Sequence, residues 1–128
     1  MENQKSAIGL DGNLAAALGY PIGIIALILI FIEKDNKFVR FHAIQSLLWG
    51  LVMTIVAIVL AIVGTVVVFA AGAASSTLVW IFGILLTLIW FVWFAALIGG
   101  VIYAAVKAYG NNLTKLPLVG AFAEKWSS

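Results

Sequence analysis

The sequence predicts an all-α integral membrane protein, with three transmembrane helices followed by a short amphipathic helix at the membrane interface. Hydrophobic residues make up 65% of the 128 residues and charged residues only 9%. Soluble domains carry about 45–50% apolar residues and about 25% charged residues. The uncharged stretches are also long enough to cross the hydrocarbon core, which takes roughly 20 residues per helix. Lipid is therefore expected to solvate most of a single membrane domain covering residues 1–128.

The first predicted span covers residues 13–32, which carry no charge. Asp11 or Asn13 is a candidate cap for its first turn. Pro21 lacks a backbone donor, so we expect a kink there, which a membrane helix tolerates when its neighbours satisfy the freed carbonyl. The residues before this span lack the basic region and apolar core of a signal peptide, so the span is expected to remain in the mature protein.

Two further spans are predicted after the charge-dense residues 33–42, which we expect to form a loop at one membrane face. No Asp, Glu, Lys, Arg or His occurs in residues 43–106, a stretch too long for one span at about 1.5 Å per residue. The small, weakly polar residues 70–77 favour a turn, which divides the stretch into helices at residues 43–69 and 78–106. Each helix exceeds the minimum length, so tilting or protrusion into the headgroups is expected.

The chain becomes polar again after the third span. Gly110 is a candidate for the left-handed residue just past the helix end, and Pro117 suits the first turn of a new helix. Apolar residues then recur every four positions: Leu118, Phe122 and Trp126. This spacing predicts a short amphipathic helix over residues 117–126 that lies in the membrane interface.

The basic residues predict the orientation. Three spans place the loop and the tail on one side of the membrane, together with most of the basic residues: Lys34, Lys37, Arg40, Lys107, Lys115 and Lys125. The other side holds Lys5 alone. By the positive-inside rule, the more basic side is cytoplasmic. We therefore expect a cell-membrane protein with its N-terminus outside and its C-terminus in the cytoplasm.

A stripe of small residues along the second span indicates close helix packing. Its members lie three or four residues apart: Ser46, Gly50, Thr54, Ala57, Ala61 and Gly64. Small residues let backbones approach closely and let Ser and Thr hydrogen-bond across helices. We interpret the stripe as packing within one three-helix bundle. The alternatives are a homo-oligomer seam or the wall of a passage between helices.

Candidate functional residues are few. His42 is the only histidine and is interpreted as an interfacial residue that orients the loop, with a proton-linked switch as the alternative. The loop charges are interpreted as solvated residues that set the topology, with a site for a partner or for anionic headgroups as the alternative. The sequence contains no catalytic set, metal-ligand cluster or phosphate-binding loop, so we predict no enzyme activity, cofactor or nucleic-acid partner.

Residues 38–48 (FVRFHAIQSLL) resemble a signature of the Tic-twenty family, which groups small prokaryotic membrane proteins with an import component of the chloroplast inner envelope. The tail residues 115–120 (KLPLVG) and the turn at Pro21 are similar to that family as well. The resemblance marks Arg40, His42 and Gln45 as signature residues and implies a contribution to a protein-conducting channel. Plant members are described with four spans, whereas three are predicted here.

Two functions follow as hypotheses. The first is a channel-like or translocon-like component that acts as an oligomer, because one three-helix unit is too narrow for a protein-sized pore. The alternative is a non-conducting scaffold or accessory subunit that docks a membrane protein partner through residues 33–42 and the amphipathic tail. In both hypotheses the lipid bilayer surrounds the helices.

Overall fold

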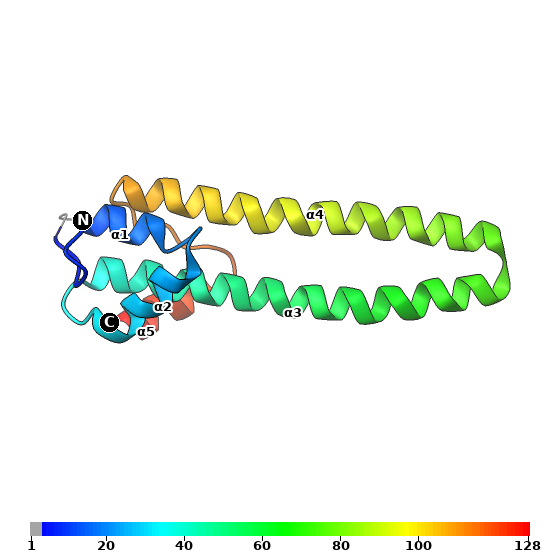
Figure 1. The fold of residues 1–128 in the computed structure, drawn as a ribbon, viewed down its shortest axis with the longest axis horizontal. Coiled ribbons are helices and arrows are strands. Elements are labelled where there is room, and N and C mark those ends of the chain that lie inside the picture. Colours follow the sequence, from blue (N-terminus) through cyan, green and yellow to red (C-terminus); the bar gives the residue numbers. More distant parts are fainter. Residues whose placement is uncertain (1–3) are drawn as a thin grey trace. The chain divides into compact units, whose positions relative to one another are not determined.

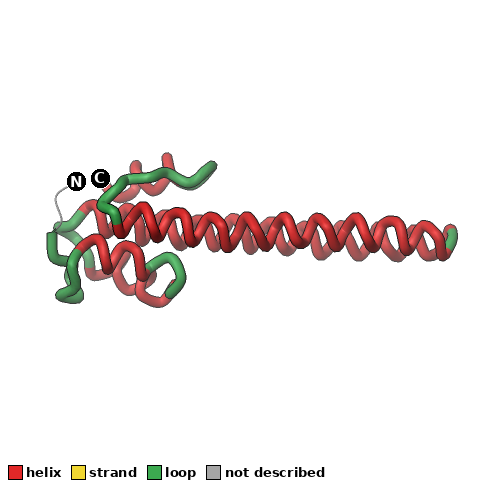
Figure 2. Tube along the Cα trace, turned by 90° about the horizontal axis from the view of Figure 1, so that it is seen from above, coloured by secondary structure: helices red, strands yellow, loops and turns green. Residues whose placement is uncertain are grey.

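The computed structural model describes residues 4–128, which form five α-helices (Figure 1). Loops join them, and the longest loop lies between the last two helices (Figure 2). The helices, in chain order, are α1 (Gly12–Leu18), α2 (Gly23–Ile32), α3 (Lys37–Ala74), α4 (Ser76–Tyr109) and α5 (Gly120–Ser127). The chain divides into two compact units. The terminal unit comprises Met1–Leu51 and Ile98–Ser128, and the uncharged unit comprises Val52–Leu97.

Two of the described helices, α3 and α4, are long and apolar enough to cross a membrane. The predicted first span, residues 13–32, is instead divided into α1 and α2, which contact each other. At ten residues, α2 is about 15 Å long, which is half of the roughly 30 Å hydrocarbon core. Neither short helix can span the core alone, so the expectation of three spanning helices is replaced by two long helices and a short helical pair.

Pro21 explains the division of the first predicted span. Its ring removes a backbone donor and clashes with the preceding turn, which ends a helix. The chain turns here through hydrogen bonds from Tyr20 N–H to the Ala17 carbonyl (3.3 Å) and from Ile22 N–H to the Leu18 carbonyl (3.0 Å). The kink expected at this proline is therefore a complete break between two helices.

The N-terminal segment contacts the loop that three spans would have placed on the opposite membrane face. Ala7 N–H donates to Glu33 Oε2 at 2.6 Å, and Asn36 Nδ2 donates to the Gln4 carbonyl at 3.1 Å. Hydrogen bonds of this length cannot cross a bilayer. The expected separation of the N-terminus from residues 33–42 is thus incompatible with these contacts.

The second predicted helix begins earlier than expected. Asn36 Oδ1 accepts a hydrogen bond from Val39 N–H (3.2 Å), which satisfies one of the free donors of a helix N-terminus. Because α3 begins at Lys37, the residues Arg40 and His42 are helical and do not belong to a loop.

The turn between the two long helices is a single residue, whereas residues 70–77 were expected to form it. The alanine-rich run continues α3 to Ala74, because alanine has the strongest helix preference. Ser75 then ends one helix and starts the next, since its Oγ accepts a hydrogen bond from Leu78 N–H at 3.1 Å.

The end of α4 is a Schellman motif. Asn112 N–H donates to the Lys107 carbonyl (2.9 Å) and Asn111 N–H to the Ala108 carbonyl (3.0 Å), which is the hydrogen-bond pair that defines this motif. Asn111 occupies the left-handed position with φ of 63°, a conformation that asparagine tolerates. The prediction that Gly110 takes this position is therefore wrong by one residue.

The uncharged unit is held together by apolar contacts between its segments of α3 and α4. A Cβ placed at Gly64 would lie 2.7 Å from Leu86 Cδ2, so α4 closes directly on this glycine. Trp93 Nε1 donates to the Met53 carbonyl at 3.0 Å. Most remaining side chains of the unit are exposed and apolar, the arrangement expected where lipid is the solvent.

In the terminal unit, α5 packs against the first turns of α3. Phe41, Ile44 and Ala123 form a buried apolar cluster, and Ile30 of α2 packs on the same cluster. The predicted amphipathic helix over residues 117–126 corresponds to α5, which begins three residues later because Pro117 and Leu118 form a turn before it.

Candidate functional site: a buried polar cluster

A polar cluster of three side chains lies inside the terminal unit. Tyr20 comes from the break between α1 and α2, while His42 and Gln45 come from the start of α3. The i, i+3 spacing places His42 and Gln45 on the same face of the helix. Both are fully buried, at 0% exposure, so each of their polar atoms requires a hydrogen-bond partner.

The two ring nitrogens of His42 have different partners. Nε2 lies 2.9 Å from the Asn112 carbonyl, and a carbonyl can only accept, so Nε2 carries the hydrogen. Nδ1 lies 2.5 Å from Tyr20 Oη and therefore accepts the phenolic hydrogen. His42 thus joins the helix break, α3 and the segment after α4, and it does not orient the loop before α3 as expected.

Gln45 completes the cluster. Its Nε2 donates to Tyr20 Oη (2.8 Å) and to the Thr114 carbonyl (2.9 Å), and its Oε1 accepts from Leu116 N–H (2.8 Å). Every donor and acceptor direction of the amide is used except one lone pair. Gln45 therefore holds the tail segment through main-chain groups on both sides of Lys115.

Aromatic rings form the walls around His42. The ring centroids of Phe38, Phe41 and Tyr20 lie 4.7, 5.0 and 5.5 Å from that of His42, each near an edge-to-face arrangement. This arrangement is favourable for aromatic pairs. The ring nitrogens face a phenol and a backbone carbonyl and no carboxylate, which fits a structural histidine better than a proton-relay residue.

Ser46 makes a hydrogen bond to a neighbouring element, as expected for a serine of the packing stripe. Its hydroxyl donates to the Gly19 carbonyl at 2.7 Å, in the non-helical turn between α1 and α2. Irregular backbone at membrane depth is tolerated only where protein satisfies its polar groups. Ser46 therefore stabilises the break beside the polar cluster.

Arg40, the third signature residue, lies outside the cluster. Its Nη1 donates to the carbonyls of Ile30 (2.9 Å) and Glu33 (3.1 Å), which caps the C-terminus of α2. Glu33 is itself buried, and its Oε1 accepts from Asn36 N–H at 3.1 Å. These residues organise the connection from α2 to α3 and are not free to bind a ligand.

The other members of the small-residue stripe lie in different environments. Gly64 is buried against Leu86, but a Cβ at Gly50 would meet no atom within 4 Å. Ala57 is half-buried, whereas Thr54 and Ala61 are exposed. The face of α3 that is covered in the uncharged unit includes Ala71 and three larger residues: Met53, Leu60 and Val68. The true contact face is therefore rotated relative to the predicted one, because large residues contribute to it.

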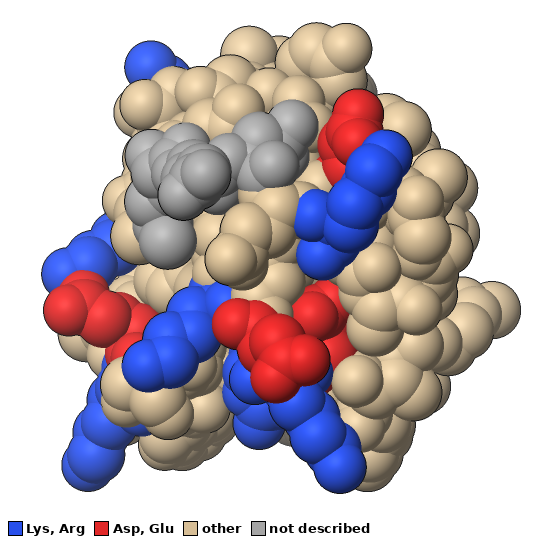
Figure 3. Space-filling view, turned by 90° about the vertical axis from the view of Figure 1, so that its left-hand side faces the viewer, with Lys and Arg blue, Asp and Glu red and all other residues tan. Residues whose placement is uncertain are grey.

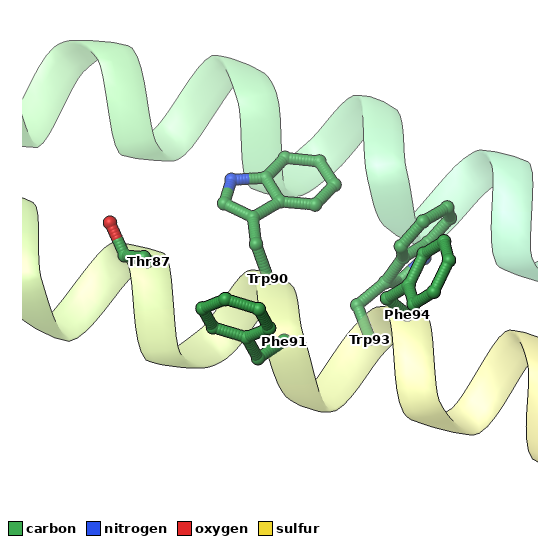
Figure 4. Close-up of a pocket in the computed structure, with 5 residues that line it drawn as sticks. All are labelled: Thr87, Trp90, Phe91, Trp93 and Phe94. Carbon is green, nitrogen blue, oxygen red and sulfur yellow. The ribbon is translucent and has the colours of Figure 1, made fainter.

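An apolar groove of about 410 Å³ on α4 is lined by Thr87, Trp90, Phe91, Trp93 and Phe94 (Figure 4). Trp90 extends from α4 toward α3 and meets Trp93 edge-to-face, with centroids 5.5 Å apart. The hydroxyl of Thr87 donates to the Gly83 carbonyl of its own helix. A groove lined in this way suits an acyl chain better than a polar ligand.

All of the lysines, arginine and acidic residues belong to the terminal unit. Figure 3 shows a face on which basic and acidic side chains are interspersed. Among the described residues, no group of three or more His, Asp or Glu side chains is placed to hold a metal ion. The charges thus form a mixed polar surface and not a single-sign patch.

Sequence reasoning identified His42 and Gln45 but missed the residues that they bind. The sequence motif at this turn was described by Pro21 alone, whereas the hydroxyl of the neighbouring Tyr20 is the centre of the cluster. The tail contributes through backbone groups, which have no residue-type signal. No residue pattern in the sequence could therefore predict these backbone partners. A tyrosine beside Pro21 inside an apolar segment was the one signal for a buried polar contact.

Comparison with known proteins identifies relatives over nearly the whole chain. Residues 3–123 match the sequence model of the magnetosome magnetite crystal formation protein family. A UPF0132 membrane protein of Methanocaldococcus jannaschii is 34% identical over 124 residues, covering 96% of this chain and 94% of that protein. A second UPF0132 membrane protein from the same organism is 30% identical over 121 residues, covering 94% of this chain and 73% of that protein. A UPF0132 membrane protein of Archaeoglobus fulgidus is 32% identical over 114 residues, covering 88% of this chain and 92% of that protein.

These matches overturn the resemblance to the Tic-twenty family. The matched residues 3–123 include both motifs on which the resemblance was based. The inference of a protein-conducting channel therefore loses its support, and Arg40, His42 and Gln45 are understood through their contacts instead. No solved structure matches the chain.

Proposed function

Because this chain belongs to the magnetosome magnetite crystal formation protein family and its UPF0132 relatives are membrane proteins, we propose that it is a non-enzymatic, non-conducting membrane scaffold. Its α3 and α4 cross the bilayer, and its terminal unit presents a charged docking surface to a membrane protein partner at the cytoplasmic face. The helical pair α1–α2 enters the same face and returns to it.

The observation that carries this proposal is the separation of charge between the two units. Residues 52–97 contain no Asp, Glu, Lys, Arg or His, while all seven Lys and Arg residues belong to the terminal unit. The contact between Ala7 and Glu33 adds Lys5 to the side that holds the loop and the tail. By the positive-inside rule this side is cytoplasmic, so both termini are proposed to lie in the cytoplasm, in place of the expected external N-terminus.

Apolar contacts between the long helices support a non-conducting role. Leu86 fills the space against Gly64, and the indole N–H of Trp93 is satisfied within the same unit by the Met53 carbonyl. A conducting path needs polar groups that replace the hydration of its cargo, and the side chains in contact here are apolar.

The topology can be tested cleanly because the chain has no cysteine. The single-cysteine variants Ala7→Cys, Asp35→Cys, Ala74→Cys and Ser128→Cys all change exposed side chains. With a membrane-impermeant maleimide on intact cells, we expect labelling only at position 74, with the other three labelled after permeabilisation. Labelling of position 7 together with position 74 would restore three spans and overturn the proposal.

A second experiment tests conduction. Liposomes that contain the protein and a trapped ionic dye are expected to remain tight at every protein-to-lipid ratio. Leakage that rises with the protein-to-lipid ratio would favour the channel-like oligomer.

The docking surface is tested with the exposed loop lysines. Lys34→Gln with Lys37→Gln should abolish recovery of a specific membrane partner, whereas Lys125→Gln, at another exposed site, should not. Arg40 is unsuitable for this experiment because it caps α2. If the partner is recovered equally with all of these variants, the charged surface has no docking role.

A further inference from the structure

The tail carries a row of exposed apolar side chains. Leu118, Phe122 and Trp126 are 77%, 54% and 52% exposed, and we name these three residues the tail ridge. Phe122 and Trp126 contact each other, with ring centroids 5.7 Å apart. Large apolar side chains grouped in this way mark an interaction surface more often than singly scattered ones do.

The opposite side of the same segment is firmly docked. Leu116, Val119 and Ala123 are buried in the terminal unit, and Ala123 belongs to the apolar cluster with Phe41 and Ile44. Gln45 also holds the main chain at Leu116. The ridge therefore cannot turn inward, and its exposure is imposed by the fold.

Leu118 is held outward by an unfavourable backbone conformation. Its φ is 68°, in the left-handed region that costs free energy for a residue with a Cβ. Hydrogen bonds on either side, from Val119 N–H to the Pro117 carbonyl and from Gly120 N–H to the Leu116 carbonyl, maintain the turn. Strain of this kind persists where surrounding structure requires it and points to a function at that site.

We propose that the tail ridge inserts into the boundary between headgroups and acyl chains of the membrane in which α3 and α4 are embedded. Lipid is the occupant because the relatives are membrane proteins and because the residue types fit an interfacial element. Tryptophan and phenylalanine suit this depth, and Lys125 is a flanking cation that can extend to the headgroups. Lys115 is paired with Glu124. Ile30 of α2 packs on the same cluster as Ala123, and α2 likewise keeps Ile24 and Phe31 exposed.

This proposal rests on the membrane location in the proposed function and adds a specific lipid-contacting site. It departs from the sequence prediction in one respect. The ridge begins at a strained turn residue before the helix, so its three residues do not belong to one helix. The turn and not helical periodicity positions Leu118.

A depth measurement tests the proposal. Leu118→Cys, Phe122→Cys and Trp126→Cys are each labelled with an environment-sensitive fluorophore and placed in vesicles of phosphatidylcholine and phosphatidylglycerol. Lipids with nitroxide on the acyl chain are expected to quench all three probes and to shift their emission to the blue. The matched control Ser128→Cys lies at an exposed polar position at the end of α5 and should keep water-like emission.

Two outcomes would overturn the proposal. If the ridge probes are no more quenched than the probe at position 128, the ridge does not contact lipid. If the blue shift disappears on dilution of the protein in lipid, without nitroxide quenching, a second copy of the chain covers the ridge. The maleimide labelling pattern is independent of both outcomes, so failure here is distinguishable from failure of the proposed topology.

Discussion

Tyr20 and His42 are joined by a hydrogen bond of 2.5 Å between the phenolic oxygen and Nδ1, although 22 residues separate them. The bond links the break after α1 to the first turns of α3. Because Gln45 also donates to the same phenolic oxygen, one buried hydroxyl connects two other polar side chains.

Removal of the Tyr20 hydroxyl should destabilise the fold. Tyr20→Phe leaves His42 Nδ1 and one Gln45 donor without their partner, and an unsatisfied buried group costs about 1–3 kcal/mol. We expect a loss of that order in the free energy of unfolding, measured by denaturant titration in detergent micelles. Tyr103→Phe is the control, because Tyr103 is 51% exposed and should change stability by less than about 0.5 kcal/mol. Equal effects of both variants would show that the cluster does not stabilise the fold.

Loss of the Gln45 amide should release the tail. Gln45→Ala removes the hydrogen bonds to the Thr114 carbonyl and from Leu116 N–H, which flank Lys115. We expect trypsin to cleave after Lys115 faster in this variant, because proteolysis requires local opening of the chain. The control is Gln4→Ala, whose side chain is exposed and should leave the cleavage rate unchanged. An unchanged rate in Gln45→Ala would mean that other contacts hold the tail.

Two adjacent glycines of α4 should respond oppositely to alanine. A Cβ at Gly100 would lie 2.6 Å from two atoms of the rigid Trp49 ring, whereas a Cβ at Gly99 would meet no atom within 4 Å. Gly100→Ala should therefore destabilise by about 1–3 kcal/mol through overpacking. Gly99→Ala should stabilise by about 0.5–1 kcal/mol, because alanine favours the helix. Thermal unfolding in the same detergent distinguishes the two, and a shift of the same sign in both variants would contradict the contact with Trp49.

The Ser46 hydroxyl should protect the break between α1 and α2. Ser46→Ala leaves the Gly19 carbonyl without its donor, so local opening should become more frequent. We expect faster hydrogen–deuterium exchange at the amides of Tyr20 and Ile22, measured by mass spectrometry on peptides from this region. In the control Ser128→Ala, which changes an exposed residue, exchange here should equal that of the unmodified chain. If Ser46→Ala also exchanges at that rate, the serine is dispensable for the break.

The sequence alone predicted a membrane protein and two long apolar helices after residue 42, although it placed the turn between them over residues 70–77 and the structure places it at Ser75. This prediction was possible because the hydrophobic cost of exposing 46 successive uncharged residues, 52–97, to water is large and independent of packing. The recurrence of Phe122 and Trp126 also indicated a short helix near the C-terminus, although the predicted pattern included Leu118, which lies in the turn before α5. These features depend on local composition, which a single chain reveals directly.

Only the tertiary structure decided whether residues 13–32 form one helix or two, and which groups the buried polar residues bind. Composition marks this segment as apolar, but whether Pro21 kinks one helix or separates two depends on the hydrogen bonds that Ser46 and Gln45 of α3 donate to the turn. His42 and Gln45 bind backbone groups about 70 residues away, and backbone groups carry no sequence signal. Contacts of this range are formed only when the whole chain folds, so the cluster became visible only in three dimensions.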